Sequence, residues 1–308
     1  MRSGWLGTVL VFALGVVAAA GLGEVALRAF GLGDPVLYDN RLAYGYRPLP
    51  DQTRRRIGGA RVHVNALGVR GPDVAATRPP GVVRLLFLGD SVTWGGSYVD
   101  DDALFAAVAA RALASRGVRV EWLDAGVNGW GPQNILGLVG ESGGFDSSVW
   151  IVTALEDDFR REKTHVGEVP YMNHSPRTAW EELLVLGSYK VVTAYKTAKP
   201  AADLERLADE NLATYRAIAE AGRARGVRVL LVWHPTIEAV AGAAEPARAR
   251  YLGLAPQVGA AALDLTPIYR AEGKDLYVDG LHLSAEGHRV AGDAIGAAIA
   301  PLLAAPNG

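Results

Sequence analysis

The chain has 308 residues, half of them hydrophobic, which suffices for one large domain with a full core and additional segments. A formal net charge of -2 leaves no basic excess to neutralise phosphates, which argues against nucleic acid as a partner. The absence of cysteine excludes disulfides, a thiolate nucleophile, an iron–sulfur cluster and a lipidated N-terminal cysteine.

The chain begins with a long apolar segment. Residues 4–23 carry no charged side chain, Arg2 precedes them and Glu24 follows. About 20 apolar residues span the hydrocarbon core of a bilayer. We predict a retained transmembrane anchor over residues 1–23, because the apolar run exceeds the usual signal-peptide core and continues as a helix. Cleavage at the small residues 18–20 is the alternative, and either interpretation places the remaining chain outside the cytoplasm.

Residues 24–81 are rich in proline, glycine, arginine and tyrosine. The alternating run 60–65 predicts a small β element, and we interpret the segment as a stalk. The three arginines at 54–56 are interpreted as a solvated stretch. Contact with anionic headgroups or an acidic polymer is the alternative.

Strands and helices alternate from residue 82 to residue 304. Strands are predicted over 82–88, 118–124, 149–154, 227–233 and 261–265, and helices over 103–115, 134–139, 201–225, 243–254 and 285–303. This alternation predicts a parallel sheet inside a three-layer α/β/α sandwich. The pattern weakens over 158–200, which is long for a structureless connection. That segment is either a helical insertion that caps a site or a segment packed on the sheet edge.

Two short motifs place a serine, an aspartate and a histidine where such a sheet concentrates its chemistry. Gly89-Asp90-Ser91 follows the first strand, and Asp279-Gly280-Leu281-His282 precedes the last helix. A serine hydroxyl is a weak nucleophile until a base takes its proton, and His282 oriented by Asp279 is such a base. Either motif alone is common in turns. Their conjunction predicts a catalytic triad of Ser91, His282 and Asp279.

With these motifs, the region 82–303 resembles the SGNH, or GDSL-like, hydrolase superfamily, whose sandwich is flavodoxin-like. Residues 89–95 resemble its nucleophile block, and residues 279–288 resemble its Asp-x-x-His block. Residues 124–129 resemble its second block, so the resemblance implies that the N–H groups of Ser91 and Gly129 form an oxyanion hole. The run 65–71 fits membrane-anchored bacterial members, some of which act on acyl groups of cell-surface polysaccharides.

The third block departs from the family pattern. The family has a Gly-x-Asn-Asp turn, whereas residues 155–158 are Leu-Glu-Asp-Asp, with Asp157 at the asparagine position. A carboxylate cannot donate a hydrogen bond, and loss of one oxyanion donor costs about two to three orders of magnitude in rate. Asp157 is therefore protonated, turned towards Arg160 or Arg161, or replaced in function by Asn128. A degraded site is the fourth alternative.

Three further side chains are candidates for substrate contact. Trp94 and Trp130 adjoin the blocks and are suited to stack on a sugar or an acyl chain, although we favour core packing. His234 follows a late strand at the edge where ligands bind, although we favour a turn-capping role. The six histidines show no ligand-like spacing, so we predict neither a metal nor a cofactor.

These features predict a serine esterase or O-acyltransferase that forms an acyl-enzyme on Ser91. The expected substrates are acyl esters, acetyl esters among them, with cell-surface glycans as a candidate class. The expected partners are that substrate and the membrane. The alternative is a non-catalytic, membrane-tethered glycan-binding protein with a degenerate site.

Overall fold

The computed structural model describes residues 3–165, 173–194, 200–273 and 275–304. Its centre is a parallel sheet of five strands in the order β6-β5-β7-β8-β9. In chain order the strands are β5 (Val83–Leu88), β6 (Val120–Asp124), β7 (Val149–Ala154), β8 (Arg228–Trp233) and β9 (Ala261–Asp264). All five predicted strands are therefore present: 149–154 has the predicted boundaries, and the other four differ by one residue or two.

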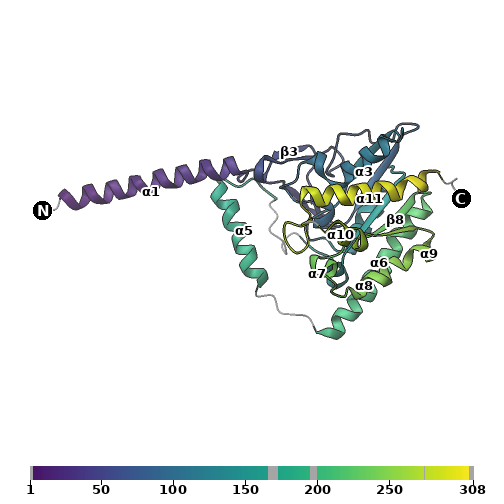
Figure 1. Ribbon diagram of the computed structural model, residues 1–308. Helices are drawn as coiled ribbons and strands as arrows, with labels where there is room; N and C mark the ends of the chain where they lie inside the picture. Colours follow the sequence, from purple (N-terminus) through teal and green to yellow (C-terminus); the bar gives the residue numbers. More distant parts are fainter. Residues whose placement is uncertain (1–2, 166–172, 195–199, 274, 305–308) are drawn as a thin grey trace.

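Both faces of the sheet are buried, because alternate residues of each strand face different cores. In β5, Leu86 and Leu88 belong to one core, whereas Leu85 and Phe87 belong to the other. The first core contains side chains of α4 (Pro132–Ser142), α6 (Ala201–Ala224), α8 (Pro246–Leu252) and α9 (Leu254–Val258). The second contains side chains of α3 (Phe105–Ala114), α10 (Thr266–Glu272) and α11 (Ala285–Ala304). The predicted α/β/α sandwich is confirmed, and Figure 1 shows α3 and α11 side by side.

The remaining short helices connect these layers. They are α2 (Ser91–Trp94), α7 (Ile237–Val240) and the 3₁₀ turns η1 (Ile57–Gly59), η2 (Asp101–Ala103) and η3 (Glu156–Arg160). The predicted helix over 243–254 is wrong in its extent. It begins at Pro246 and is interrupted at Gly253, after which α9 starts, since proline favours a first helical turn and glycine an end.

The segment 24–81 contains the predicted β element as two antiparallel hairpins. β1 (Tyr38–Leu42) pairs with β2 (Gly45–Pro48), and β3 (Gln52–Arg55) pairs with β4 (Arg61–Val64). The stalk interpretation is wrong, because Tyr46, Val62 and Val64 are fully buried in the core that α4 and α6 cover. The segment is thus part of the folded domain.

Two buried arginines connect this segment to the rest of the domain through ion pairs and hydrogen bonds. Arg70 is fully buried, where its guanidinium pairs with Asp101 (2.8 Å) and donates to the carbonyl of Trp94 (2.7 Å). Arg56 is also buried and pairs with Glu182, so the interpretation of residues 54–56 as a solvated run is wrong at Arg56. The side chains of Arg54 and Arg55 are not buried.

Two helices lie outside the sandwich. α1 (Ser3–Phe30) projects from the domain, and its residues Trp5–Phe30 are long and apolar enough to cross a membrane, with a mean hydropathy of 2.2. α5 (Ala179–Ala194) starts beside the C-terminal end of α1 and leaves it at a steep angle (Figure 1). α5 lies within the predicted insertion 158–200, whose residues 166–172 and 195–199 are outside the described residues.

Candidate active site

Ser91 is the first residue of α2 and follows directly on the tight turn after β5. The Asp90 side chain accepts a hydrogen bond from the Val92 N–H (2.9 Å) and so caps α2, which begins at Ser91. The turn requires glycine at position 89, because a Cβ there would lie 2.0 Å from the hydroxyl oxygen of Thr93. The local sequence Gly-Asp-Ser thus places the serine just beyond the carboxyl end of a buried strand.

Ser91, His282 and Asp279 form one continuous chain of hydrogen bonds. His282 Nε2 lies 2.9 Å from Ser91 Oγ, and His282 Nδ1 lies 2.8 Å from an Asp279 carboxylate oxygen. Because the Asp279 carboxylate is an acceptor only, Nδ1 carries the proton and Nε2 is free to accept from the serine hydroxyl. The structure therefore brings together all three residues predicted as a triad.

The Asp279 carboxylate is held ionised by its surroundings. Partial burial works against ionisation, but hydrogen bonds from the backbone N–H and imidazole of His282 outweigh it and lower the pKa of Asp279. The backbone N–H groups of Leu281 and His282 donate to one carboxylate oxygen at 2.8 and 2.7 Å. The other oxygen is left to orient the imidazole.

His234 supports the loop that carries Asp279 and His282, so its predicted contact with substrate is wrong. Its side chain is 1% exposed, and its Nε2 donates to the carbonyl of Leu281 (3.0 Å). Burial lowers the pKa of His234 to about 4, which keeps the ring neutral. His234 thus supports the loop that carries Asp279 and His282 from its buried side.

Gly129 and Asn128 adjoin Ser91 and His282 in the same cleft. Gly129 has a φ of 77°, which glycine adopts without strain. The Tyr46 hydroxyl donates to the carbonyl of Asn128 (2.6 Å), and the Thr164 hydroxyl donates to that of Gly129 (2.7 Å). Among the described residues no acceptor pairs with the backbone N–H of Gly129 or of Ser91. Both donors are available to an oxyanion.

Asp157 does not occupy the place that the asparagine of the third block would fill. Its side chain is exposed and is not among the residues that line the cleft. The second open alternative named Arg160 or Arg161 as its partner, but Arg160 pairs with Glu156, and the carboxylates that contact Arg161 are those of Asp90 and Asp158. The Asp157 carboxylate is therefore exposed to water and does not place a negative charge in the cleft.

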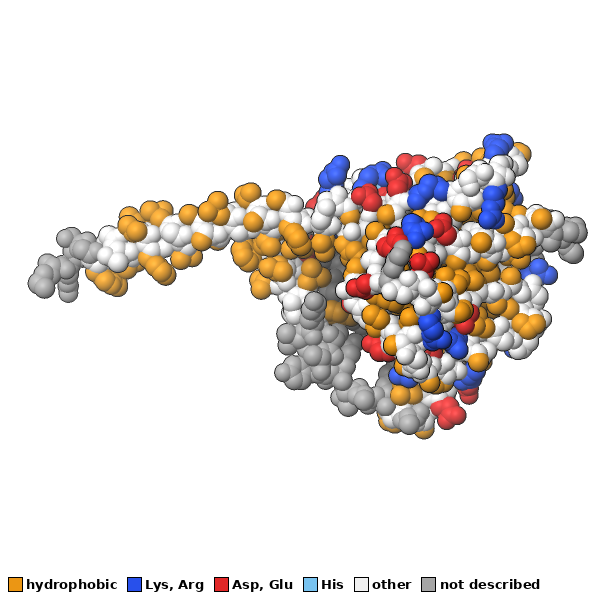
Figure 2. Space-filling view, in the orientation of Figure 1, with side chains coloured by type: hydrophobic (Ala, Val, Ile, Leu, Met, Phe, Trp, Pro, Cys, Tyr) orange, Lys and Arg blue, Asp and Glu red, His pale blue; other side chains and the backbone are white. Residues whose placement is uncertain are grey.

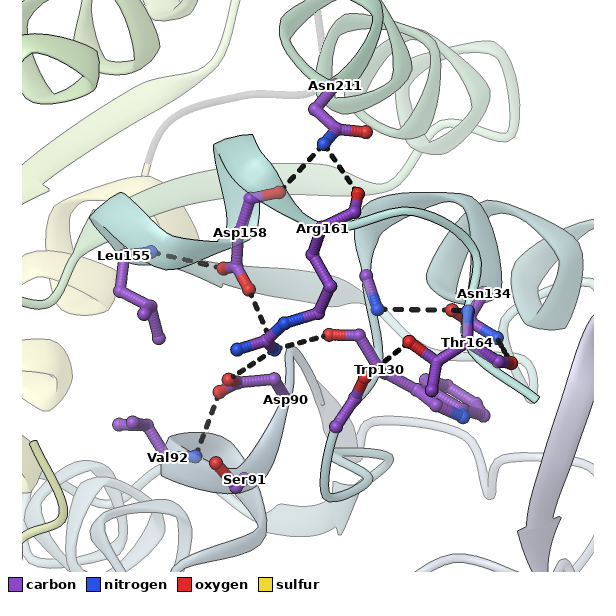
Figure 3. A network of polar contacts seen from close by, with 12 residues as sticks. Asp90, Ser91, Val92, Trp130, Asn134, Leu155, Asp158, Arg161, Thr164 and Asn211 are labelled. Carbon is purple, nitrogen blue, oxygen red and sulfur yellow. Dashed lines mark hydrogen bonds and ion pairs between the residues drawn. The ribbon is translucent and has the colours of Figure 1, made fainter. Parts of the chain in front are cut away.

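Arg161 is the cleft residue whose role sequence reasoning missed. One terminal nitrogen, Nη1, donates to Asp90 (2.9 Å), to the Trp130 carbonyl (2.8 Å) and to Asp158 (3.3 Å). Figure 3 shows the Asp90 carboxylate between this guanidinium and the turn that carries Ser91. The sequence signal was weak: an arginine three residues after the buried Asp158, in a turn that departs from the family pattern.

Asp158 is a buried carboxylate at the centre of a polar network. It accepts hydrogen bonds from the Tyr215 hydroxyl (2.8 Å) and the Leu155 N–H (3.1 Å). Burial, followed by repulsion from the Asp90 carboxylate, raises the pKa of Asp158, and Arg161 opposes this rise. Asn211 on α6 donates to the backbone carbonyls of Asp158 and Arg161 (2.8 Å each), so the network fixes the third-block turn (Figure 3).

Trp94 and Trp130 are core residues, as the favoured packing interpretation has it, and their candidate role in stacking on substrate is wrong. Both side chains are 0% exposed. The Trp94 ring packs under the Arg70 guanidinium, 5.1 Å from the ring centroid, and the Trp130 indole N–H donates to the Tyr46 carbonyl (2.9 Å). Large aromatic rings beside the blocks here stabilise the turns.

The cleft above the triad has a volume of about 440 Å³. The residues that line it include Ser91, Asn128, Gly129, Arg161 and His282, together with Val185, Leu186 and Tyr189 of α5. Part of the segment 158–200 therefore lines the site. Among the residues that the structure describes, no three His, Asp or Glu side chains gather as a metal site.

No protein-family model matches the chain. A search of curated proteins likewise finds no match.

Several solved structures are similar to this chain. A lipolytic protein of the G-D-S-L family from Veillonella parvula is 11% identical, with 73% of this chain and 100% of that chain covered and a TM-score of 0.45. The family 3 carbohydrate esterase of Clostridium thermocellum is 17% identical, with 74% and 100% covered and a TM-score of 0.42. A two-domain esterase active on acetylated mannans is 13% identical, with 74% and 51% covered and a TM-score of 0.48.

At these identities and TM-scores, the similarity to solved structures carries no argument about the function of this chain. The chemistry proposed for this chain therefore rests on the geometry of its own site.

Proposed function

We propose that the chain is a serine esterase that forms an acyl-enzyme on Ser91. The observation that carries this proposal is the continuous hydrogen-bonded chain from Asp279 through His282 to Ser91 Oγ, at the wall of an open cleft. A buried structural serine would need neither a histidine acceptor nor a cleft. The ionised Asp279 and the fixed tautomer of His282 are suited to general-base catalysis.

The proposed reaction has two halves. His282 Nε2 takes the Ser91 hydroxyl proton while Oγ attacks the ester carbonyl carbon, and the carbonyl oxygen becomes an oxyanion. The C–O bond to the alcohol then breaks, and the alcohol leaves with the proton from His282. Water repeats the sequence on the acyl-enzyme and releases the acid. When a sugar hydroxyl replaces water, the same acyl-enzyme gives O-acyl transfer.

The oxyanion is stabilised by the backbone N–H groups of Ser91 and Gly129, with Arg161 as the third donor. Nη1 of Arg161 is engaged by Asp90, Asp158 and a carbonyl, but a guanidinium has five N–H groups in all. Among the described residues no acceptor pairs with the three N–H groups on Nε and Nη2, and Arg161 lines the cleft with Ser91. A cationic donor in this place compensates for the missing asparagine. The Asn128 amide is the alternative third donor.

The proposed substrate is an acyl ester, acetyl included, of a cell-surface glycan. The sequence resemblance to membrane-anchored SGNH members suggests this class, and the cleft supports it with polar lining side chains, among them Tyr38, Ser97, Asn128 and Tyr189, beside apolar ones. Arg161 adds a cationic group to that lining. These groups fit a hydroxyl-rich alcohol that carries a small acyl chain.

We further propose that α1 is retained as a single-pass anchor and that the domain lies outside the cytoplasm. The contacts of α1 support retention over cleavage after Ala20. The Trp180 indole N–H donates to the carbonyl of Ala20 (3.1 Å), and Gly23 packs against the Trp180 ring. A chain cleaved after Ala20 would lose the first of these contacts.

Two measurements on one pair of proteins test the esterase proposal. The intact chain is expected to react with a fluorophosphonate probe and to cleave p-nitrophenyl acetate, whereas Ser91→Ala is expected to lose both, with the rate falling by about six orders of magnitude or to background. A chain that neither reacts nor cleaves the ester would instead fit the non-catalytic glycan-binding alternative. Equal ester cleavage by Ser91→Ala would place the nucleophile elsewhere.

A further inference from the structure

α5 has two apolar faces, which lie on opposite sides of the helix. Val185, Leu186 and Tyr189 share one side by helical spacing and line the active-site cleft together with Glu182. Trp180, Leu183 and Leu184 share the other side, where their exposed fractions are 40%, 38% and 70%. A helix with a solvated outer face would carry polar residues at those three positions. Trp180 contacts the end of α1, and the exposed side chains of Leu183 and Leu184 continue the apolar face beyond that contact.

α5 is fixed to the end of α1 through polar contacts. The Glu24 carboxylate accepts hydrogen bonds from the backbone N–H groups of Ala179 (2.9 Å) and Trp180 (3.4 Å), at the start of α5. Glu182, one turn further, accepts from the Gly33 N–H (2.6 Å) and pairs with the buried Arg56. These contacts set the direction in which α5 leaves α1.

The contact with α1 lies where the proposed anchor leaves the bilayer. Residues 5–23 carry no charge, and at about 1.5 Å per residue they span about 28 Å, close to the thickness of the hydrocarbon core. The first charged side chain after them is Glu24, so the membrane boundary falls beside Trp180. A Cβ at Gly23 would lie 2.4 Å from the Trp180 ring, so glycine is needed for this close approach. Tryptophan is enriched at this depth in membrane proteins.

The direction of α5 matches a helix that lies on the bilayer surface. Figure 1 shows α5 leaving the end of α1 at a steep angle, so α5 turns away from the direction of the proposed span. Figure 2 shows hydrophobic side chains at the start of α5 adjoining those of α1 without a polar band between them. The apolar surface is thus continuous from the proposed anchor to α5.

We propose that α5 is an interfacial helix whose outer face, formed by Trp180, Leu183 and Leu184, inserts into the headgroup region of the bilayer that α1 spans. This inference rests on the proposed anchor and extends the proposed function. α5 then forms the partition between the bilayer surface and the cleft, with one face in lipid and the other beside Ser91 and His282. The esterase site is held at the membrane surface, within reach of acyl esters or glycans attached there.

The absence of cysteine allows a direct test in the full chain. Single cysteines are introduced as Leu184→Cys on α5, Leu22→Cys near the end of α1 and Asp293→Cys on the exposed side of α11, and each is labelled with an environment-sensitive fluorophore. Leu184, Leu22 and Asp293 all have exposed side chains, so the substitutions leave the core intact. The proteins are reconstituted into phosphatidylcholine–phosphatidylglycerol vesicles with or without a lipid that carries a spin label near the headgroup.

We expect the probe at Leu184→Cys to lose emission to the spin-labelled lipid about as strongly as the probe at Leu22→Cys, and the probe at Asp293→Cys to lose little. Strong quenching at Leu22→Cys with no quenching at Leu184→Cys would overturn the interfacial placement and leave the anchor intact. Absence of quenching at Leu22→Cys would overturn the anchor and, with it, this inference. A blue shift at Leu184→Cys that grows with the protein-to-lipid ratio, without quenching by lipid, would assign the face to a second copy of the chain instead.

Discussion

At the scale of single residues, the candidate site depends on the charges around Ser91 as well as on the triad. Asp90 caps the turn of the nucleophile, and its carboxylate is 2.9 Å from Arg161. The same guanidinium lies 3.3 Å from the buried carboxylate of Asp158. The Arg161 guanidinium thus contacts two buried carboxylates and also lines the cleft. Arg161 therefore contributes both to the folded structure and to the proposed catalysis.

Arg161→Lys tests the proposed third oxyanion donor. Lysine keeps the positive charge near Asp90 and Asp158 but replaces the planar five-donor fork by a single ammonium, so it cannot engage both carboxylates and the cleft in the same geometry. We expect kcat for an activated ester to fall by about two to three orders of magnitude, with little change in KM. Ester kinetics together with the thermal unfolding midpoint separate this effect from a loss of stability.

The neighbouring variants Arg160→Lys and Asp157→Asn are the matched controls. Both side chains are exposed and neither lines the cleft, so we expect their kcat to match that of the parent. A parent-like kcat for Arg161→Lys would assign the third donor to Asn128. An increase in kcat for Asp157→Asn would mean that its carboxylate reaches the oxyanion hole after all.

The burial of Asp124, at the end of β6, predicts that the stability of the protein depends on pH. It is fully buried, one carboxylate oxygen accepts from the Gly126 N–H (2.8 Å), and the other has no partner among the described residues. Burial raises the pKa of Asp124 from 3.8 to about 8. Between these values the folded state keeps a proton that the unfolded chain has released. Its contribution to the free energy of unfolding is therefore present below about pH 4 and is lost as the pH rises towards 8.

Asp124→Asn keeps the shape of the side chain and removes this titration. We expect the variant to lose less stability than the parent between pH 5 and pH 8, as measured by the thermal midpoint of the full chain in detergent. Other buried groups titrate equally in both proteins, so the difference between the two isolates Asp124. Parallel pH profiles for parent and variant would show that Asp124 titrates near its ordinary value in the folded state.

At the scale of elements, the sheet was predictable and the cleft wall was not. β5, β7 and β8 are short apolar runs between turn residues, and such runs have few alternatives inside an α/β pattern. The sequence did not predict α5 as a defined helix, because its apolar residues cover two opposite faces. No single apolar stripe therefore marks the segment as an amphipathic helix. The triad was predictable because its roles require particular residue types. Arg161 was not, because its role depends on which buried carboxylates come near it.

The buried ion pair between Arg56 and Glu182 is expected to stabilise the attachment of α5 to the rest of the domain. Both side chains are less than 10% exposed, and Glu182→Gln leaves the Arg56 guanidinium without its counter-charge. Removal of one partner of a buried ion pair costs about 3–5 kcal/mol, so we expect a clear drop in the thermal midpoint. The adjacent Glu181→Gln, whose side chain is partly exposed, is the control and is expected to change little.

A double variant, Arg56→Met with Glu182→Met, separates charge from packing. Replacement of both partners by apolar groups avoids an unpaired buried charge, so the double variant is expected to be more stable than Glu182→Gln. Equal midpoints for Glu182→Gln and Glu181→Gln would show that the pair contributes nothing to the attachment of α5.

At the scale of the whole molecule, the chain combines a projecting apolar helix with a domain that includes the segment once interpreted as a stalk. The sequence predicted the order of these parts, but not the burial of Tyr46, Val62 and Val64 in the domain core. Short β strands rich in polar residues give no sign of which sheet or helix they will cover. The cleft consequently lies close to the end of α1 and is not held away from it.

The retained anchor predicts the N-terminus of the mature protein. We expect intact-mass analysis of protein extracted from cell membranes to show α1 complete through Glu24, and we expect the protein to remain in the membrane pellet after an alkaline carbonate wash. The physical reason is the apolar length of α1 together with its contacts to Trp180 at Ala20 and Gly23. A mature N-terminus after Ala20, with the protein in the soluble fraction, would establish a cleaved signal peptide instead.

The central claim is an acyl-enzyme on Ser91, and mass spectrometry of that intermediate tests it most directly. The full chain is mixed with p-nitrophenyl acetate, quenched in acid within the first turnovers and digested for peptide mapping. The account predicts an acetyl group on the peptide that contains Ser91, absent from Ser91→Ala and reduced in His282→Ala. Turnover of the ester with an unmodified Ser91 peptide, or with acetyl on another side chain, would contradict it.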